Sequence, residues 1–204
     1  MSFDSGLITT GLKKAWGAFA SNAVALILGV LIAVFGSLLI VTSAPLAYGF
    51  CYMCIKATRG EKVAITDVFY GFKSLSVFIR SWIYFIIVLI ILFIVGIINS
   101  ILSIIPYLGA IVAFILGIFV YMFMIFTLYV YVMRASENIV YALKESFNII
   151  KSNILMTLVV AIIAYILILV GVLFIIVWLV TIPIAVVFGA YVLKEIAPST
   201  KDES

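Results

Sequence analysis

Two cysteines one helical turn apart are the residues of this chain whose spacing could do chemistry. The stretch CYMC places Cys51 and Cys54 on one helical face, and a Cys-x-x-Cys pair serves thiol–disulfide exchange or metal binding. A structural zinc site needs about four ligands, however, and the sequence contains no histidine and no third cysteine. We therefore interpret both cysteines as packing residues, and we expect no metal site and no cofactor.

No other sequence pattern is typical of catalysis. The chain contains no glycine-rich phosphate-binding loop, no nucleophile elbow and no HExxH zinc motif. A charge at mid-membrane costs about 2.5–3.5 kcal/mol and is retained where function needs it, yet the apolar stretches described below contain none. Proton-coupled pumps and intramembrane proteases need such groups. The sequence therefore predicts a protein that is not an enzyme and has no catalytic residues.

The composition is that of an integral membrane protein. Of the 204 residues, 68% are hydrophobic and 10% are charged, and the mean hydropathy is +1.45, which leaves too little polar surface to cover a water-soluble globule. Lys13 and Lys14 precede an apolar run, as in a secretory signal. The run from Ala23 to about Val41 is longer than the usual signal core of about 7–15 residues. We therefore expect a retained first membrane span.

Three long stretches contain no Asp, Glu, Lys or Arg: Ala23–Ile55, Ser81–Met133 and Ser152–Leu193. As a single helix the middle stretch would be about 80 Å long, whereas the hydrocarbon core is about 30 Å thick. It must therefore fold back, and Pro106 and Gly109 mark the turn. The sequence predicts an all-α integral membrane fold of about six limbs, arranged as three helical hairpins.

The first and third hairpins turn at less obvious positions. In the first, breaks at Gly36 and at 42–45 leave a second limb of only Pro45–Thr58. That limb would be roughly 21 Å long, so it crosses a thin part of the bilayer, runs past the interface or is re-entrant. In the third hairpin, Gly171 and the segment 181–183 punctuate the apolar stretch.

This arrangement puts the charged segments on one side of the membrane. The connectors 56–80 and 134–151 carry most of the charges, the two termini carry the rest, and the three opposite turns carry none. Because Lys and Arg concentrate in cytoplasmic loops, we expect a multi-pass protein of the cell membrane with cytoplasmic N- and C-termini. Membrane lipids are the expected partners. We expect no nucleic-acid binding, because acidic residues dilute the positive charge of the connectors.

One polar-to-apolar transition occurs twice. GLKKAWGAFASN, from Gly11, resembles ALKESFNIIKSN, from Ala142, and each continues into an apolar run. A helix with one apolar face, aromatic residues and lysines is typical of the membrane interface, and we interpret the Ser-Asn pair as an elbow where the chain turns into the bilayer. A weaker copy precedes the middle hairpin. The predicted elbow residues are Lys13, Trp16 and Asn22, then Phe72, then Lys144, Phe147 and Asn153.

The repeat divides a single membrane domain, 1–204, into units 7–58, 66–133 and 136–196, with a polar tail at 197–204. Each unit is an amphipathic interfacial elbow helix followed by a hairpin. In the third elbow helix, Ser136–Lys151, helical spacing gathers the apolar residues on one face. That face consists of Ile139, Val140, Leu143, Phe147 and Ile150.

Two further patterns concern helix packing and a solute path. Small residues at four-residue spacing let membrane helices approach closely, and we interpret them as intramolecular packing sites, with a subunit interface as the alternative. They are Gly109, Ala113 and Gly117, and then Ala185 and Gly189. Asn99, Ser100 and Ser103 form the most polar cluster away from the charged connectors, and they either solvate the turn or line a permeation path.

Three motifs resemble those of a prokaryotic group of integral membrane proteins, domain-of-unknown-function family 975. They are RGE at Arg59–Glu61, DVFYGF at Asp67–Phe72 and ALKESFNIIKSN at Ala142–Asn153. The chain is also similar to the membrane domain joined to some glycerophosphodiester phosphodiesterases, and the last hairpin of those proteins contains a proline, as Pro183 does here. The resemblance implies several membrane spans. It supplies no catalytic residues, and this chain contains no phosphodiesterase domain.

Two functions are compatible with these patterns. The first is a non-enzymatic membrane protein that binds lipids, itself as a homo-oligomer, or another membrane subunit, through its elbow helices. The alternative is a channel or facilitator for a small neutral or apolar solute. Such a path would be lined by the polar cluster and by the backbone at the proline and glycine breaks.

Overall fold

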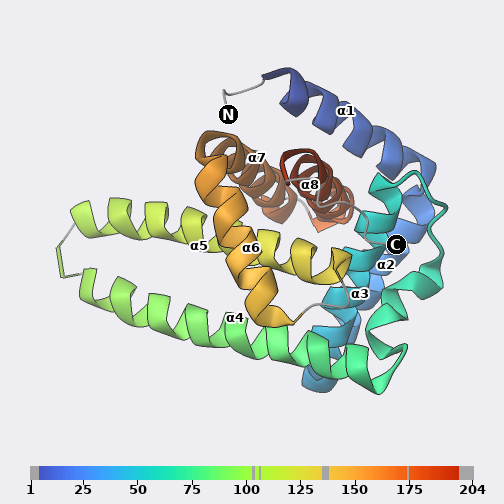
Figure 1. Ribbon diagram of the computed structural model, residues 1–204, viewed down its shortest axis with the longest axis horizontal. Helices are drawn as coiled ribbons and strands as arrows, with labels where there is room; N and C mark the ends of the chain where they lie inside the picture. The colour runs from blue at the N-terminus through green and yellow to red at the C-terminus, as the bar shows by residue number, and fades with distance from the viewer. Residues whose placement is uncertain (1–4, 103, 106, 135–137, 174, 198–204) are drawn as a thin grey trace.

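The computed structural model describes residues 5–102, 104–105, 107–134, 138–173 and 175–197, and every regular element in these ranges is a helix (Figure 1). This confirms the all-α class predicted from the sequence. The elements are α1 (Ser5–Ser21), α2 (Ala23–Gly36), α3 (Ile40–Thr58), the 3-10 helix η1 (Ile65–Phe72), α4 (Leu75–Leu102), α5 (Leu108–Met133), α6 (Ile139–Ser152), α7 (Ile154–Leu173) and α8 (Ile175–Ile196).

Several helices are long and apolar enough to cross a membrane. Four qualify alone: α3, α4, the part of α5 from Gly109 to Met133, and the part of α8 from Val177 to Ile196. Two pairs, α1 with α2 and α6 with α7, qualify only together, and they bend by 87° and 105°. The described residues thus hold four candidate spans, or up to six if each bent pair counts as one. The chain is therefore a multi-pass membrane protein, as its composition predicts.

The second limb of the first hairpin is longer than the sequence predicts. α3 begins at Ile40, contains 19 residues and is about 28 Å long, so it matches the thickness of a bilayer core. Pro45 was expected to begin the limb but lies inside the helix. As the sixth residue of α3 it removes one backbone hydrogen bond, and a membrane helix tolerates this where neighbouring groups satisfy the freed carbonyl. Nearby, the Thr42 and Ser43 hydroxyls donate to backbone carbonyl oxygens one turn earlier.

The third hairpin does not turn at Pro183. The segment 181–183 lies inside α8, whereas α7 ends at Leu173 and α8 begins at Ile175. Proline is tolerated within a membrane helix because neighbouring helices and local adjustments satisfy the freed carbonyl group. Gly171 belongs to the last turn of α7, close to the break between α7 and α8.

Helix α3 lies at the centre of the fold. It packs against α2, η1, α4, α5 and α8, and its Cys51 and Cys54 are buried, free thiols. Helix α1 lies against α8, where Gly11 faces the rings of Phe188 and Tyr191. The core therefore contains segments from both ends of the chain, which Figure 1 shows side by side.

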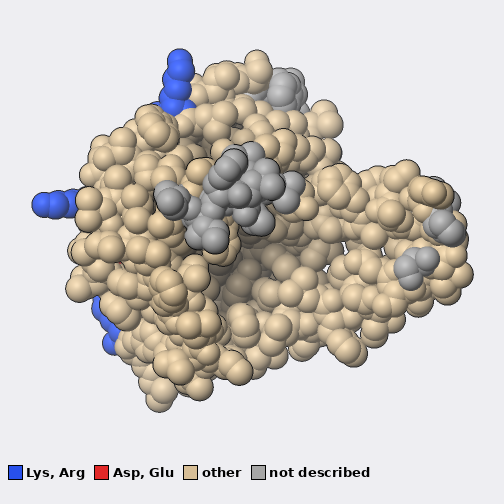
Figure 2. Space-filling view, turned by 180° about the vertical axis from the view of Figure 1, so that it is seen from behind, with Lys and Arg blue, Asp and Glu red and all other residues tan. Residues whose placement is uncertain are grey.

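Helices α4 and α5 form an arm that extends beyond the other helices at its turn (Figure 1). The arm runs at a steep angle to the α2–α3 pair in this view. None of the residues in the most apolar stretch of α4 is buried inside the protein. On the face seen in Figure 2, Lys and Arg side chains lie away from the arm, and the described surface of the arm shows no charged residue. In a membrane this surface contacts lipid or another apolar chain.

Candidate functional site at the helix bends and the α3–η1 connector

A single residue links α1 to α2. Asn22 has φ −128° and ψ 20°, and its Nδ2 donates to the carbonyl oxygen of Ala18 at 3.1 Å. Its Oδ1 accepts from the backbone N–H of Val63 at 3.0 Å. The side chain therefore covers an exposed carbonyl at the end of α1 and ties the bend to the connector that follows α3.

The bend between α6 and α7 has the same local structure. Asn153 is again the only linking residue, with φ −133° and ψ 39°. Its Nδ2 donates to the Ile149 carbonyl oxygen at 3.2 Å, four residues earlier, as Asn22 does to Ala18. The two segments that share a sequence pattern therefore share a backbone conformation and a hydrogen bond at their last residue.

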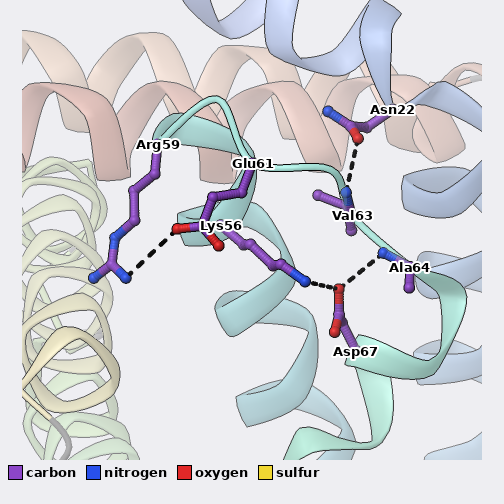
Figure 3. A network of polar contacts seen from close by, with 7 residues as sticks. All are labelled: Asn22, Lys56, Arg59, Glu61, Val63, Ala64 and Asp67. Atoms are coloured by element: carbon purple, nitrogen blue, oxygen red, sulfur yellow. Dashed lines mark hydrogen bonds and ion pairs between the residues drawn. The ribbon is translucent and has the colours of Figure 1, made fainter.

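An ion pair holds the start of η1 against α3. Lys56 Nζ lies 2.9 Å from Asp67 Oδ2, and the same oxygen accepts from the Ala64 backbone N–H at 2.8 Å (Figure 3). The Lys56 and Asp67 side chains are only 22% and 17% exposed. The pair between Arg59 and Glu61 is looser, at 4.0 Å, and nearly half exposed. Asp67 is therefore the residue that joins helix, connector and η1.

Two glycines let η1 lie directly on α3. A Cβ at Gly49 would overlap the carbonyl oxygen of Val68, and a Cβ at Gly71 would overlap that of Pro45. Both contacts are between backbones, so no side-chain rearrangement can relieve them. Sequence reasoning missed this feature: Gly71 lies within the DVFYGF motif, but no pattern indicates that it or Gly49 contacts another backbone.

A tyrosine cluster between η1, α3 and α5 contacts Arg80 through Tyr131, and the sequence patterns did not reveal it. The rings of Tyr52 and Tyr70 stack at 3.8 Å, and Tyr48 meets Tyr131 edge to face. The Arg80 guanidinium lies 4.5 Å from the Tyr131 ring centre and donates to the Tyr131 carbonyl oxygen at 3.2 Å. Arg80 immediately precedes the middle charge-free stretch, and that position was the available signal.

Aromatic residues project outward at each predicted elbow. Trp16 and Phe147, which align in the repeat, are both 58% exposed, and Phe72 is 40% exposed. Lys13 and Lys144 are also exposed. The bends thus present an aromatic ring and an amine to the surroundings at equivalent positions.

The small residues of α8 pack inside the protein. Ala185 is 2% exposed, and a Cβ at Gly189 would approach the Tyr129 hydroxyl oxygen to 2.7 Å. That hydroxyl donates to the Val186 carbonyl oxygen at 2.9 Å. The close approach of α8 to α5 therefore depends on Gly189.

The other predicted residues lie on the arm: Asn99 and Ser100 in α4, and Gly109, Ala113 and Gly117 in α5. A Cβ at Gly117 would meet nothing within 4 Å, so this glycine makes no close contact with another helix of the described chain. The buried Oδ1 of Asn99 has no hydrogen-bond partner among the described residues. Ser103 and Pro106 lie outside the described residues, and the solute path stays a prediction.

The arrangement is one of binding and positioning groups. Asn22, Lys56 and Asp67 form hydrogen bonds or an ion pair with one another's neighbouring segments, and these contacts hold the connector in place. Among the described residues no group of three or more His, Cys, Asp or Glu could hold a metal ion. Comparison with known proteins gives no match to a family model, a curated protein or a solved structure.

We expect Asp67→Ala to lower the free energy of unfolding by about 2 kcal/mol, because Lys56 loses its partner and the Ala64 N–H its acceptor. A thiol-reactive fluorophore measures this in detergent, since Cys51 and Cys54 become reactive only when the fold opens. The matched control is Glu61→Ala, which removes an exposed pair and should cost less than about 0.5 kcal/mol. Equal shifts for the two variants would contradict the role of Asp67 in joining the three segments.

Proposed function

We propose that this protein is a non-enzymatic, multi-pass membrane protein that acts by binding membrane lipids at the interface, through helices α1 and α6 at its two bends. The observation that carries the proposal is the pair of exposed rings: Trp16 and Phe147 are 58% exposed at equivalent places, beside exposed lysines. In this proposal α1, η1 and α6 are each followed by a hairpin. These hairpins are α2–α3, α4–α5 and α7–α8, respectively.

The angles of the two bends support this role. A helix lying in the interface and a helix entering the bilayer meet at roughly a right angle, and bends of 87° and 105° suit that arrangement. Tryptophan and phenylalanine rings are stabilised at the headgroup boundary. Lysines beside them attract anionic lipids, at about 1 kcal/mol per basic residue. In this proposal α1 and α6 anchor the protein on the side of the membrane that carries its charges, the cytoplasmic side.

We retain the relationship to domain-of-unknown-function family 975 as a proposal. Its support is positional: Arg59–Glu61 forms the loop after α3, and Asp67–Phe72 makes up most of η1. Two of the three motifs that carry the resemblance thus fall on the connector that Asn22 and Asp67 hold in place.

The depth of Trp16 tests the proposed function. The chain has three tryptophans, so a variant with Trp82→Phe and Trp178→Phe leaves Trp16 as the only one. We expect its fluorescence in reconstituted vesicles to be quenched more strongly by lipids labelled near the headgroup than by lipids labelled at the chain end. The control variant, Trp16→Phe with Trp178→Phe, retains Trp82 in α4 and reports the depth of a helix away from the bend.

Two outcomes would overturn the proposal. Quenching of Trp16 by aqueous iodide alone would mean that the ring faces water. Shielding from both iodide and lipid quenchers would mean that a second copy or another protein covers α1, and interface lipid would then not be its ligand.

A further inference from the structure

A cavity of about 360 Å³ lies between α1, the end of α3 and α8. Its wall includes Lys14, Gly17 and Ser21 from α1, Thr58 from the last turn of α3, and Tyr191 from α8. Because α3 and α8 are both candidate spans, the cavity lies close to their ends, at the depth where the headgroups of a bilayer begin.

The cavity contains one positive charge. The Lys14 ammonium lies 4.7 Å from the centre of the Tyr191 ring, a distance at which cation and ring attract each other. The carboxylate of Glu195 attracts this amine electrostatically. Lys13, Arg59 and Lys62 add positive charge in the neighbouring segments. Two other polar side chains of the wall already have partners: Asn22 bonds to Val63 and Ala18, and the Thr58 hydroxyl donates to the Ile55 carbonyl oxygen. Lys14 is thus the charged donor that a ligand would meet.

Small residues keep the space open. A Cβ at Gly17 would meet nothing within 4 Å, and the same holds at Gly60, whose φ of 74° also favours glycine. A larger side chain at Gly17 would therefore enter the cavity without disturbing the fold. This separates the cavity from the tight glycine contacts of η1, where substitution acts on packing.

We propose that this cavity binds the phosphate group of one anionic phospholipid, with Lys14 as the ion-pairing residue. The inference rests on the proposed lipid-binding function and names the ligand class and the site within it. An anionic lipid suits a site with a single amine in a basic surrounding, and the position at the ends of α3 and α8 leaves its acyl chains in the hydrocarbon region.

Native mass spectrometry in a neutral detergent tests the site. Phosphatidylglycerol is titrated against the intact protein, with phosphatidylcholine of the same chains and inorganic phosphate as separate probes. We expect one tightly retained phosphatidylglycerol, and Lys14→Gln should weaken its affinity about fivefold. The matched control is Lys73→Gln, which removes the same charge from an exposed position after η1, outside the cavity, and should leave that first binding step unchanged.

A second pair of variants tests the space rather than the charge. Gly17→Leu should abolish the tightly bound lipid, whereas Gly96→Leu, at another glycine whose Cβ would meet nothing within 4 Å, should not. Equal effects of Lys14→Gln and Lys73→Gln would overturn the site, because the lipid would then be held by general surface charge. Displacement of the lipid by inorganic phosphate would overturn the lipid assignment.

The failure of this inference is distinct from failure of the proposed function. If Trp16 lies at headgroup depth but Lys14→Gln binds phosphatidylglycerol normally, the interface function stands and the cavity is not its site. If the wild-type protein retains no anionic lipid and Trp16 is quenched only from water, both are wrong.

Discussion

Replacing Gly49 by alanine should destabilise the protein by about 3 kcal/mol, at the upper end of what overpacking usually costs. A Cβ there would overlap the carbonyl oxygen of Val68, which belongs to the backbone of η1 and has no rotamer to change. The new methyl group must therefore push η1 away from α3. That movement would also strain the Lys56–Asp67 pair. Gly71→Ala should act in the same direction, because its Cβ would overlap the backbone of Pro45.

Gly96→Ala is the matched control for this prediction. Gly96 lies inside α4 and its Cβ would meet nothing within 4 Å, so alanine should stabilise the helix by about 0.5–1 kcal/mol. The reactivity of the buried thiols on heating measures all three variants. If Gly49→Ala and Gly96→Ala unfold at the same temperature, η1 does not lie on α3 as described.

The sequence predicted those features that depend on local patterns. A charge-free stretch longer than a bilayer predicts a break in the helix, and in the middle stretch α4 ends at Leu102 and α5 begins at Leu108. The transition after Lys13 and Trp16 pointed to a change of direction, and the chain bends at Asn22 and at Asn153. Each of these signals lies within about a dozen neighbouring residues.

Features that depend on distant segments were not predictable in this way. Pro45 and Pro183 look like helix breaks in the sequence, but α3 and α8 continue through them, because a membrane helix tolerates a proline where neighbouring groups satisfy the freed carbonyl. The contacts of Gly49 and Gly71 with η1 join residues that no periodicity relates. The tyrosines of the cluster that contacts Arg80 likewise come from separate helices.

Periodicity also left open which side of an amphipathic helix meets protein. In α6 the apolar face was expected to include Val140 and Phe147, yet these are 52% and 58% exposed. The residues buried against the fold are Ala142, Ser146, Ile149 and Ile150. Two of these, Ala142 and Ser146, are small enough for neighbouring helices to come close, whereas Val140 and Phe147 remain outside. In water the exposure of Val140 and Phe147 would be costly, but in a membrane these side chains can contact lipid.

The second prediction with a large effect concerns membrane topology. Each connector should be either accessible from outside the cell or fully protected. With three reversals in the bilayer, every charged connector stays on the cytoplasmic side. A chain with a different number of reversals would place one of these connectors on the other side of the membrane. Exposed Lys62 and Lys151 each mark one charged connector. Tyr107, 87% exposed, marks the opposite turn of the arm.

The most direct test of this topology is labelling of single new cysteines with a membrane-impermeant maleimide in intact cells. The native cysteines are buried and should give a low background. We predict that Tyr107→Cys is labelled from outside, whereas Lys62→Cys and Lys151→Cys are labelled only after the membrane is permeabilised. Labelling of Lys62→Cys or Lys151→Cys in intact cells would contradict the three-hairpin topology, because a charged connector would then lie outside.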